Sequence, residues 1–183
     1  MNKIRLGVIG LRRGVAYIDQ AGDTGFELVA VCDKWESRLK TSFGHEVALY
    51  TDYDEFLKHD MDAVVLANYF HEHAPFAIKA LRSGKHVLSE TSCNMTLAEG
   101  VTLCRAVEET GLIYMLAENY PFIRPIQEMR RLYHAGEIGR VTYAEGEYNH
   151  PCPERMANEL APGHYHWRNW VPPTYYNTHA LAR

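Results

Sequence analysis

Several features that would place this sequence in a special class are missing. No stretch approaches the roughly 18 continuous apolar residues of a membrane-spanning helix, so we expect no membrane partner. No internal repeat or low-complexity segment occurs, which excludes a repeat architecture. Positive charge is not in excess: the formal net charge is -4, which gives no electrostatic reason to expect nucleic acid as a partner.

Cysteine is scarce and unpaired in its spacing. The four cysteines, Cys32, Cys93, Cys104 and Cys152, are scattered along the chain. This excludes a disulfide framework and suits reduced cytosolic thiols. The chain also enters an apolar run almost at its first residue, which leaves no room for a signal peptide. We therefore expect a cytoplasmic protein.

What remains is the composition of an ordinary globular protein. The 183 residues are 46% hydrophobic and 23% charged. A chain of this length can bury one full domain core and part of a second.

The first stretch, residues 3–14 (KIRLGVIGLRRG), is typical of a buried strand that turns sharply into a helix. In a dinucleotide-binding unit that turn carries G-x-G-x-x-G/A and places phosphate beside backbone N–H groups. Aligned on Gly10, only one glycine is in register here, and arginine side chains offer a second way to meet phosphate. The residues predicted to bind the cofactor in this turn are Gly10, Leu11, Arg12, Arg13 and Gly14.

Asp33 strengthens this interpretation, because it closes a second apolar run over residues 26–32. An acidic residue about twenty positions after the glycines binds the ribose of the cofactor. Its carboxylate would repel a 2′-phosphate, which favours NAD over NADP. Lys34 and Arg38 leave NADP open, and a helix cap is the other role that Asp33 could have.

Strand and helix patterns then alternate through two-thirds of the chain. After the first strand, we expect strands at residues 26–32, 47–50, 61–67, 85–89 and 112–117. We expect helices at residues 15–21, 35–43 and 72–82. A longer helix should run from Thr96, where Glu99 completes a capping box, to Gly111. Such alternation predicts an α/β fold with a doubly wound parallel sheet. We predict a dinucleotide-binding Rossmann domain over residues 1–121.

The pattern changes after residue 121. We expect a helix at 126–134, a strand at 141–148 with one exposed face, an irregular segment at 149–173 and a helix that begins near residue 178. Residues 122–183 therefore read as the incomplete beginning of an α+β substrate domain.

Further cofactor contacts are expected where strands end, because ligands of such sheets bind at the carboxyl edge. One group of candidates follows the strand at 61–67 and another candidate follows the strand at 85–89: Asn68, Tyr69, His71, His73 and Glu90. His71 and His73 could instead form a metal pair, but two histidines without further ligands are a weak signal. Glu90 could instead be a buried structural carboxylate.

Histidines and aromatic residues crowd the last 35 positions of the chain. A zinc site could be assembled there from His150, Cys152, Glu154, His164, His166 and His179, but the spacing matches no zinc motif, and we predict no metal. Trp167, Trp170, Tyr175 and Tyr176 are either core aromatics or a surface on which a sugar stacks.

By residue 90 the chain resembles the glucose-fructose oxidoreductase/inositol dehydrogenase (Gfo/Idh/MocA) family. The resemblance is carried by the start at Ile4, by Asp33, and by residues 73–78 (HAPFAI) and 83–90 (SGKHVLSE). It implies a Rossmann domain followed by a largely antiparallel substrate domain, NAD(P) as cofactor, a carbohydrate-type substrate and a homo-oligomeric full-length form.

One departure from the family concerns the triplet after the fifth strand. The family carries Glu-Lys-Pro there, with the lysine near the reacting hydroxyl, whereas this chain has Glu90, Thr91 and Ser92. Threonine has no titratable proton near neutral pH and cannot replace that lysine as an acid.

Residues 148–150 (YNH) and 175–182 (YYNTHALA) are similar to the corresponding segments of a narrower branch, the NAD-dependent α-N-acetylgalactosaminidases, which also lack that lysine. There the cofactor oxidises the sugar at C3, a tyrosine removes the C2 proton, the aglycone leaves, water adds and the hydride returns. The resemblance implies Tyr176 as the C2 base and His179 as the residue that assists the C3 hydroxyl. It also implies that Asn119, in the segment at 117–119, contacts the cofactor; the implied or candidate substrate contacts are Tyr148, His150, Trp167 and Tyr175.

Three functions follow as alternatives. The first is an NAD(P)-dependent oxidoreductase that transfers a hydride at a carbinol carbon of a sugar or sugar-like substrate. The second is an NAD-dependent glycosidase that regenerates its cofactor in each cycle. The third is a non-catalytic NAD-binding fragment.

Overall fold

A computed structural model describes residues 3–40, 43, 46–149, 151–172 and 177–181. The chain divides into two compact units, Met1–Ala117 and Glu118–Arg183, which are described separately below. The predicted domain boundary at residues 121 and 122 lies close to this division and stays a prediction.

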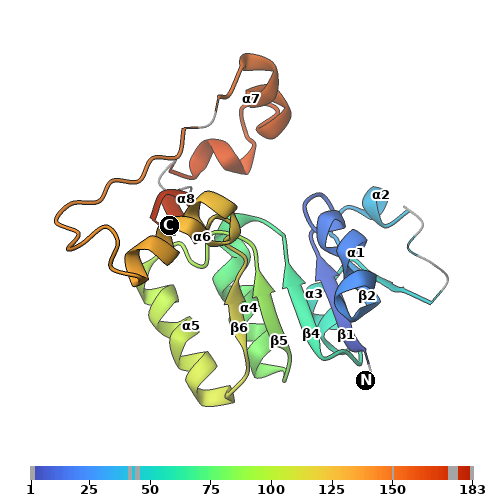
Figure 1. Cartoon of the computed structure of the whole chain (residues 1–183). Helices are drawn as coiled ribbons and strands as arrows, with labels where there is room; N and C mark the ends of the chain where they lie inside the picture. Colours follow the sequence, from blue (N-terminus) through green and yellow to red (C-terminus); the bar gives the residue numbers. More distant parts are fainter. Residues whose placement is uncertain (1–2, 41–42, 44–45, 150, 173–176, 182–183) are drawn as a thin grey trace. The chain divides into compact units, whose positions relative to one another are not determined.

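The first unit is built on one parallel sheet of six strands (Figure 1). Its strands run in the order β3-β2-β1-β4-β5-β6, so the chain starts at the centre and winds outward in both directions. The strands are β1 (Ile4–Ile9), β2 (Phe26–Cys32), β3 (Ala48–Tyr50), β4 (Ala63–Leu66), β5 (His86–Ser89) and β6 (Tyr114–Leu116). This order confirms the predicted doubly wound Rossmann fold.

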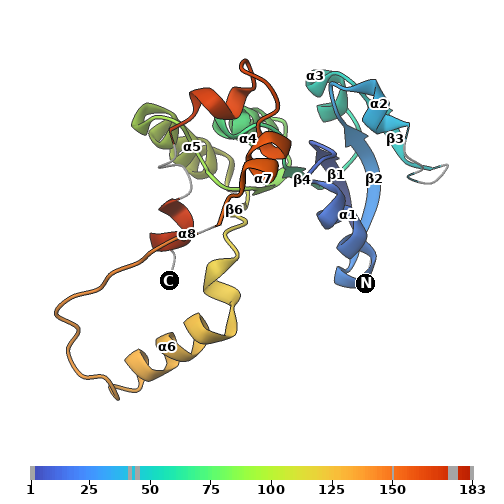
Figure 2. The same ribbon diagram turned by 90° about the horizontal axis from the view of Figure 1, so that it is seen from above.

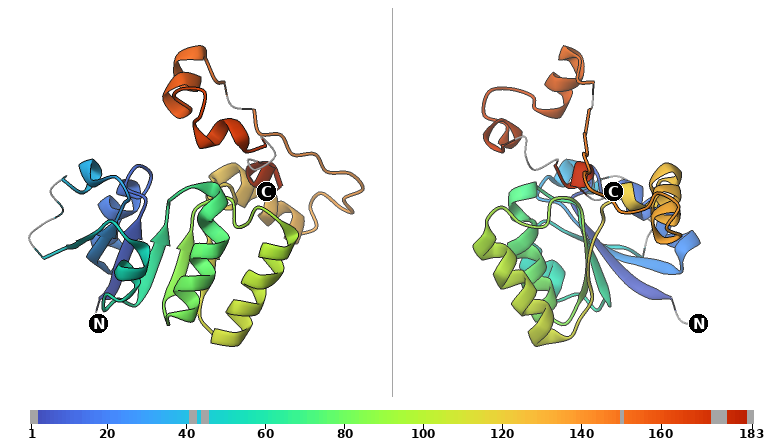
Figure 3. Two further views of the ribbon diagram at one scale, coloured as in Figure 1. Left: turned by 180° about the vertical axis from the view of Figure 1, so that it is seen from behind. Right: turned by 60° about the vertical axis from the view of Figure 1, so that its left-hand side comes forward.

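Alternation along the central strands decides which side chains face which layer. In β4, Val64 and Leu66 join the core under helices α3, α4 and α5, whereas Val65 joins the core under α1 on the opposite face. Both faces are buried, which is why β4 reads as a continuous apolar run. Figure 3 shows α4 and α5 side by side on one face of the sheet.

Except for α2, the helices of the first unit lie close to the positions that the sequence indicates. They are α1 (Val15–Ala21), α2 (Glu36–Leu39), α3 (Tyr53–Leu57), α4 (His73–Arg82) and α5 (Leu97–Thr110). The Asp52 carboxylate caps α3 by accepting from the backbone N–H groups of Asp54 and Glu55. Thr96 and Glu99 form the predicted capping box of α5, and Gly111 ends that helix in the left-handed conformation.

The second unit holds the helices α6 (Arg124–His134), α7 (Glu154–Leu160) and α8 (Asn177–Leu181) and a 3-10 turn at Trp167–Trp170. Figure 2 shows α6 and the extended segment that follows it in orange. Among the described residues of the whole chain, no helix combines the length and apolar character needed to cross a bilayer.

Three local predictions were wrong. Residues 141–148 are extended but form no strand, because no described segment pairs with their backbone. Residues 154–160 form α7 inside the segment expected to be irregular, since a short helix leaves little periodicity to read. The helix expected at 35–43 covers only Glu36–Leu39 within the described residues.

Candidate functional site

The turn after β1 is so tight that two of its positions require glycine. Gly10 has φ +89°, and a Cβ there would lie 2.3 Å from the carbonyl oxygen of Ala67. The Gly14 N–H donates to the Gly10 carbonyl at 2.8 Å, and a Cβ on Gly14 would lie 2.7 Å from Val8 Cγ1. At these two positions no side chain covers the backbone at the carboxyl end of the central strand, as close approach of a pyrophosphate requires.

Asp33, directly after β2, is buried and holds this turn in place. Its Oδ2 accepts from the Leu11 N–H at 2.9 Å and from Arg38 Nη1 at 3.2 Å, and its Oδ1 accepts from the Trp35 N–H at 2.9 Å. Three donors on one carboxylate fix its orientation. The predicted role of Asp33 as a ribose ligand stays a prediction; the observed contacts show that it also ties the turn after β1 to the loop after β2.

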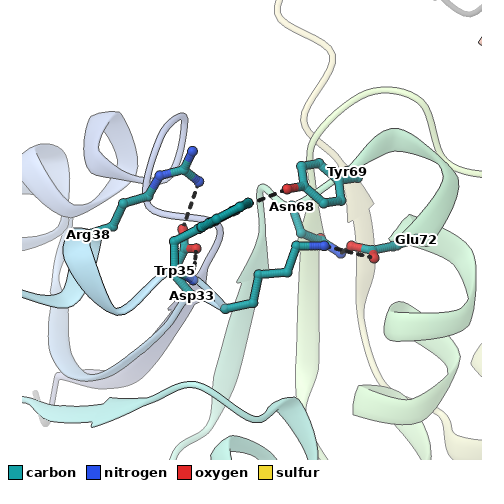
Figure 4. A network of polar contacts seen from close by, with 7 residues as sticks. Asp33, Trp35, Arg38, Asn68, Tyr69 and Glu72 are labelled. Carbon is teal, nitrogen blue, oxygen red and sulfur yellow. Dashed lines mark hydrogen bonds and ion pairs between the residues drawn. The ribbon is translucent and has the colours of Figure 1, made fainter. Parts of the chain in front are cut away.

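The loops after β2 and β4 meet through polar contacts, which Figure 4 shows from close by. Trp35 Nε1 donates to the Tyr69 hydroxyl at 3.2 Å, and the Lys34 ammonium lies 4.0 Å from the centre of the Tyr69 ring. Asn68 Nδ2 donates to Glu72 at 3.1 Å. Because β1 lies between β2 and β4 in the sheet, the loops that make these contacts lie on both sides of the carboxyl end of β1.

Asn68 also offers an acceptor. Its Oδ1 is buried and has no hydrogen-bond partner among the described residues. A buried acceptor without a donor is uncommon in folded proteins, so it indicates a ligand that supplies one. The tight turn at Gly10 and Gly14 and this unpaired oxygen are both features that suit a dinucleotide bound at the carboxyl edge of the sheet.

Glu90, directly after β5, is largely buried and carries three contacts. Its Oε1 accepts from Arg13 Nε at 2.6 Å and from the Tyr17 hydroxyl at 3.0 Å, and its Oε2 accepts from the Thr91 N–H at 3.2 Å. Burial, followed by the neighbouring Glu90 charge, raises the pKa of Tyr17, which keeps that hydroxyl protonated as a donor. Glu90 thus links the turn after β1 to the end of β5.

The two predicted cofactor contacts His71 and His73 lie in different environments. His73 is fully buried, and its Nδ1 lies 2.7 Å from the Ser92 carbonyl oxygen. Burial lowers the pKa of His73, so the ring is neutral near pH 7. Its predicted cofactor contact stays a prediction. His71 is exposed and stacks on the Tyr69 ring with centroids 5.8 Å apart. Among the described residues, no three His, Cys, Asp or Glu side chains gather as metal ligands.

In the second unit His179 lies in a compact polar-aromatic cluster. Its Nδ1 is 2.7 Å from Oε1 of Glu118, and both side chains are largely buried. The rings of Tyr120 and Tyr148 lie against the imidazole, with centroids 4.9 and 4.7 Å away. The structure therefore brings the predicted residues Tyr148 and His179 together and adds Glu118 to them.

The remaining predicted residues stay apart or undescribed. Asn119 is exposed beside Glu118, and Trp167 lies in the 3-10 turn with the Arg168 guanidinium 4.9 Å from its ring centre. The predicted residues Tyr176, Tyr175 and His150 lie outside the described part of the chain.

Sequence reasoning missed Tyr17, Trp35 and Glu118. Glu118 follows β6 as Glu90 follows β5, so the rule that selects residues after strands could have found it. Tyr17 lies on a helix, where nothing in the sequence marks its contact with a residue 73 positions away.

The sequence also matches a known family. Residues 4–118, more than half of the chain, match the family described as "Oxidoreductase family, NAD-binding Rossmann fold" (GFO_IDH_MocA). The chain belongs to this family. The membership confirms the predicted family, the Rossmann fold and NAD as the cofactor of that fold.

Curated relatives point to a narrower group. An enzyme named alpha-N-acetylgalactosaminidase from Shewanella oneidensis is 27% identical over 199 aligned positions, which cover 100% of this chain and 43% of the relative. A glycosyl hydrolase family 109 protein from Shewanella sp. strain ANA-3 is 28% identical with the same coverage. The chain thus spans less than half the length of these relatives.

Solved structures share the fold. Scyllo-inositol dehydrogenase from Lactobacillus casei, with bound NAD(H) and scyllo-inositol, superposes with a TM-score of 0.71 at 24% identity, over 76% of this chain and 43% of that one. The WlbA dehydrogenase from Chromobacterium violaceum, in complex with NADH and UDP-GlcNAcA, gives 0.72 at 20% identity over 76% and 42%. At these identities the likeness shows the fold alone.

Proposed function

We propose that this chain binds NAD(H) at the carboxyl edge of its sheet and takes part in hydride transfer at a carbinol carbon of a sugar or sugar-like substrate. The observation that carries the proposal is the bare turn at Gly10, held by Asp33 and flanked by the buried acceptor of Asn68. NAD, when bound, supplies the hydride acceptor for this chemistry. NADP is the less favoured cofactor.

The proposed cofactor contacts divide by the part of the dinucleotide that they meet. Leu11 and the two glycines of the turn lie against the pyrophosphate, and the Arg12 and Arg13 guanidiniums supply positive charge. Asp33 accepts from ribose, and Tyr69 and His71 offer exposed ring surface. Glu90 and Asn119 complete the proposed set.

On the substrate side, we assign His179 the proton of the reacting hydroxyl. An imidazole ring nitrogen that carries no hydrogen is a suitable acceptor for this proton. Tyr148, His150, Trp167 and Tyr175 are the proposed sugar contacts, with aromatic rings suited to stacking on a sugar face.

A second candidate, NAD-dependent glycoside cleavage, is favoured by a specific observation. Thr91 stands where a sugar dehydrogenase of this family carries its acid lysine. In this alternative Tyr176 removes the C2 proton after transient oxidation at C3, and the hydride returns at the end of the cycle. The relatives named for glycosidase activity support the same alternative.

Calorimetric titration of the 183-residue chain with NADH tests cofactor binding. We expect saturable heat below millimolar ligand, and an absence of heat and of thermal shift at millimolar NAD(H) overturns the proposal. Replacing Arg12→Gln should weaken binding about tenfold or more, since a hydrogen bond to a charged group contributes about 1.5–3 kcal/mol. Arg140→Gln, an exposed arginine in the second unit, is the matched control and should leave the affinity unchanged.

A panel of aryl α- and β-glycosides with NAD separates the two activities. Release of aglycone without net NADH indicates the glycosidase, and NADH formed in proportion to turnover indicates the dehydrogenase. NADH binding with neither product indicates a non-catalytic NAD-binding module. His179→Ala should abolish turnover and leave NADH affinity intact; activity that survives removes His179 from the catalytic set.

The proposal also includes a cytoplasmic setting and a homo-oligomer. All four cysteines are free thiols, which supports a reducing compartment. Burial, followed by the charges of Asp33 and Asp52, raises the pKa of Cys32 to about 12, so that this thiol stays unreactive. Cell fractionation and light scattering after size exclusion test these two statements.

A further inference from the structure

Two ionisable side chains that lie 61 positions apart in the sequence meet inside the second unit. His179 Nδ1 lies 2.7 Å from Oε1 of Glu118. The side chains are 13% and 6% exposed, so the contact is largely shielded from water. A short hydrogen bond in such surroundings is stronger than its surface equivalent.

The chemistry of the two groups decides where the imidazole proton lies. An ionised carboxylate only accepts hydrogen bonds, so the ring nitrogen that faces Glu118 carries the N–H. In neutral imidazole this places the lone pair on the other nitrogen, Nε2. Glu118 therefore sets the tautomer of His179 in which Nε2 is the basic atom.

The neighbours of this pair fix its geometry. The Tyr120 ring stacks on the imidazole at an interplanar angle of 28°, and the Tyr148 ring lies against it at 45°. Glu118 is itself held, because the Tyr120 N–H donates to the same Oε1 at 3.1 Å. The ring plane of His179 is thus set by two aromatic contacts and one carboxylate.

The second oxygen of the carboxylate provides an independent observation. Oε2 of Glu118 is buried and has no hydrogen-bond partner among the residues that the structure describes. Folded proteins seldom leave such an acceptor without a donor, so it indicates a bound molecule that supplies an N–H or O–H group.

We propose that Glu118 is a positioning residue that holds His179 as the Nδ1–H tautomer, with Nε2 as the base for a substrate hydroxyl. The inference rests on the proposed function. In the step that it serves, the substrate O–H bond breaks and its proton forms a bond to Nε2. With NAD bound, the carbinol C–H bond would break as its hydride is transferred to the oxidised cofactor, and the alcohol would become a carbonyl.

Nitrogen NMR of the full 183-residue chain, at a pH where the imidazole is neutral, reads this tautomer directly. His179→Asn identifies the resonance. In the unaltered chain Nδ1 should appear as the protonated nitrogen. Glu118→Gln should lose this preference, because an amide can donate to Nδ1 as well as accept from it. Glu128→Gln, an exposed glutamate paired with Arg131, is the matched control and should change nothing.

The second readout is steady-state kinetics, measured with whichever of the two activities the glycoside panel detects. Glu118→Gln should lower kcat about 10- to 100-fold, as loss of a group that orients a functional histidine does, with KM little changed. Glu118→Asp should recover part of kcat. Circular dichroism and NADH affinity, both unchanged, establish that the variants are folded.

The outcomes separate the two proposals. NADH binding and turnover with Glu118→Gln as active as the parent chain overturn the positioning role and leave the proposed function standing. Nδ1 unprotonated in the parent chain overturns it as well. If NADH does not bind, the proposed function fails, and the tautomer measurement alone decides whether the Glu118–His179 pair is formed as described.

Discussion

Replacing Gly10 by alanine tests the tight turn on which the cofactor proposal depends. The substitution has two costs. An L-residue in the left-handed region, where Gly10 lies at φ +89°, costs roughly 1–2 kcal/mol. The added methyl also meets backbone: it would lie 2.3 Å from the Ala67 oxygen and 2.6 Å from the Asn68 nitrogen. Such overpacking costs about 1–3 kcal/mol, because backbone atoms cannot rotate away.

Gly111→Ala isolates the second cost. Gly111 lies in the same unit at φ +65°, but a Cβ there meets nothing within 4 Å. It should therefore show only the conformational cost of about 1–2 kcal/mol. Gly10→Ala should lose about 1–3 kcal/mol more than this control in the free energy of unfolding measured by urea titration.

Binding adds an independent check. Gly10→Ala moves the turn that we assign to the pyrophosphate, so NADH affinity should fall, whereas Gly111→Ala should leave it unchanged. Losses of stability that agree within about 0.5 kcal/mol, with equal NADH affinities, would refute the reasoning, because the crowding against Ala67 would then have no consequence.

Two further predictions concern stability. Thr96→Ala removes the hydroxyl that accepts from the Glu99 N–H and should cost about 1 kcal/mol in urea titration, whereas Thr102→Ala, mid-helix, should be close to neutral; equal effects would contradict the capping role. His73 has a lowered pKa in the folded chain, so below pH ~6.5 the unfolded chain takes up a proton that the folded chain does not. The free energy of unfolding should fall as the pH drops below that value, by up to ~1.4 kcal/mol per pH unit. His73→Asn, which cannot titrate, should flatten this slope between pH 5 and 7. An unchanged slope would assign the acid sensitivity to other groups.

The parts of the fold that could be predicted are those with local causes. Val64, Val65 and Leu66 mark a strand buried on both faces, and Thr96 and Glu99 mark where α5 begins. The parallel, doubly wound character of the sheet followed from the alternation of strands and helices, because crossover connections leave few topologies open.

The parts that could not be predicted depend on contacts between segments that are distant in the sequence. Residues 141–148 carry a strand pattern, but an alternating segment becomes a strand only when another backbone accepts its hydrogen bonds. Both members of the Arg13–Glu90 pair were candidates, but their contact joins strands that are not adjacent in the sequence. The burial of His73 was equally hidden, since it directly follows residues 68–72 (NYFHE), which have the polar and aromatic composition of a binding loop.

The hydrogen bond from the Leu11 amide to Asp33 gives the protein an internal reporter. A single buried N–H connects the turn after β1 with the loop after β2, so its exchange with solvent requires both segments to separate. The protection of this one amide in hydrogen-exchange measurements therefore reports how often the sheet edge opens. A molecule that settles on this edge should slow that exchange before any chemistry takes place.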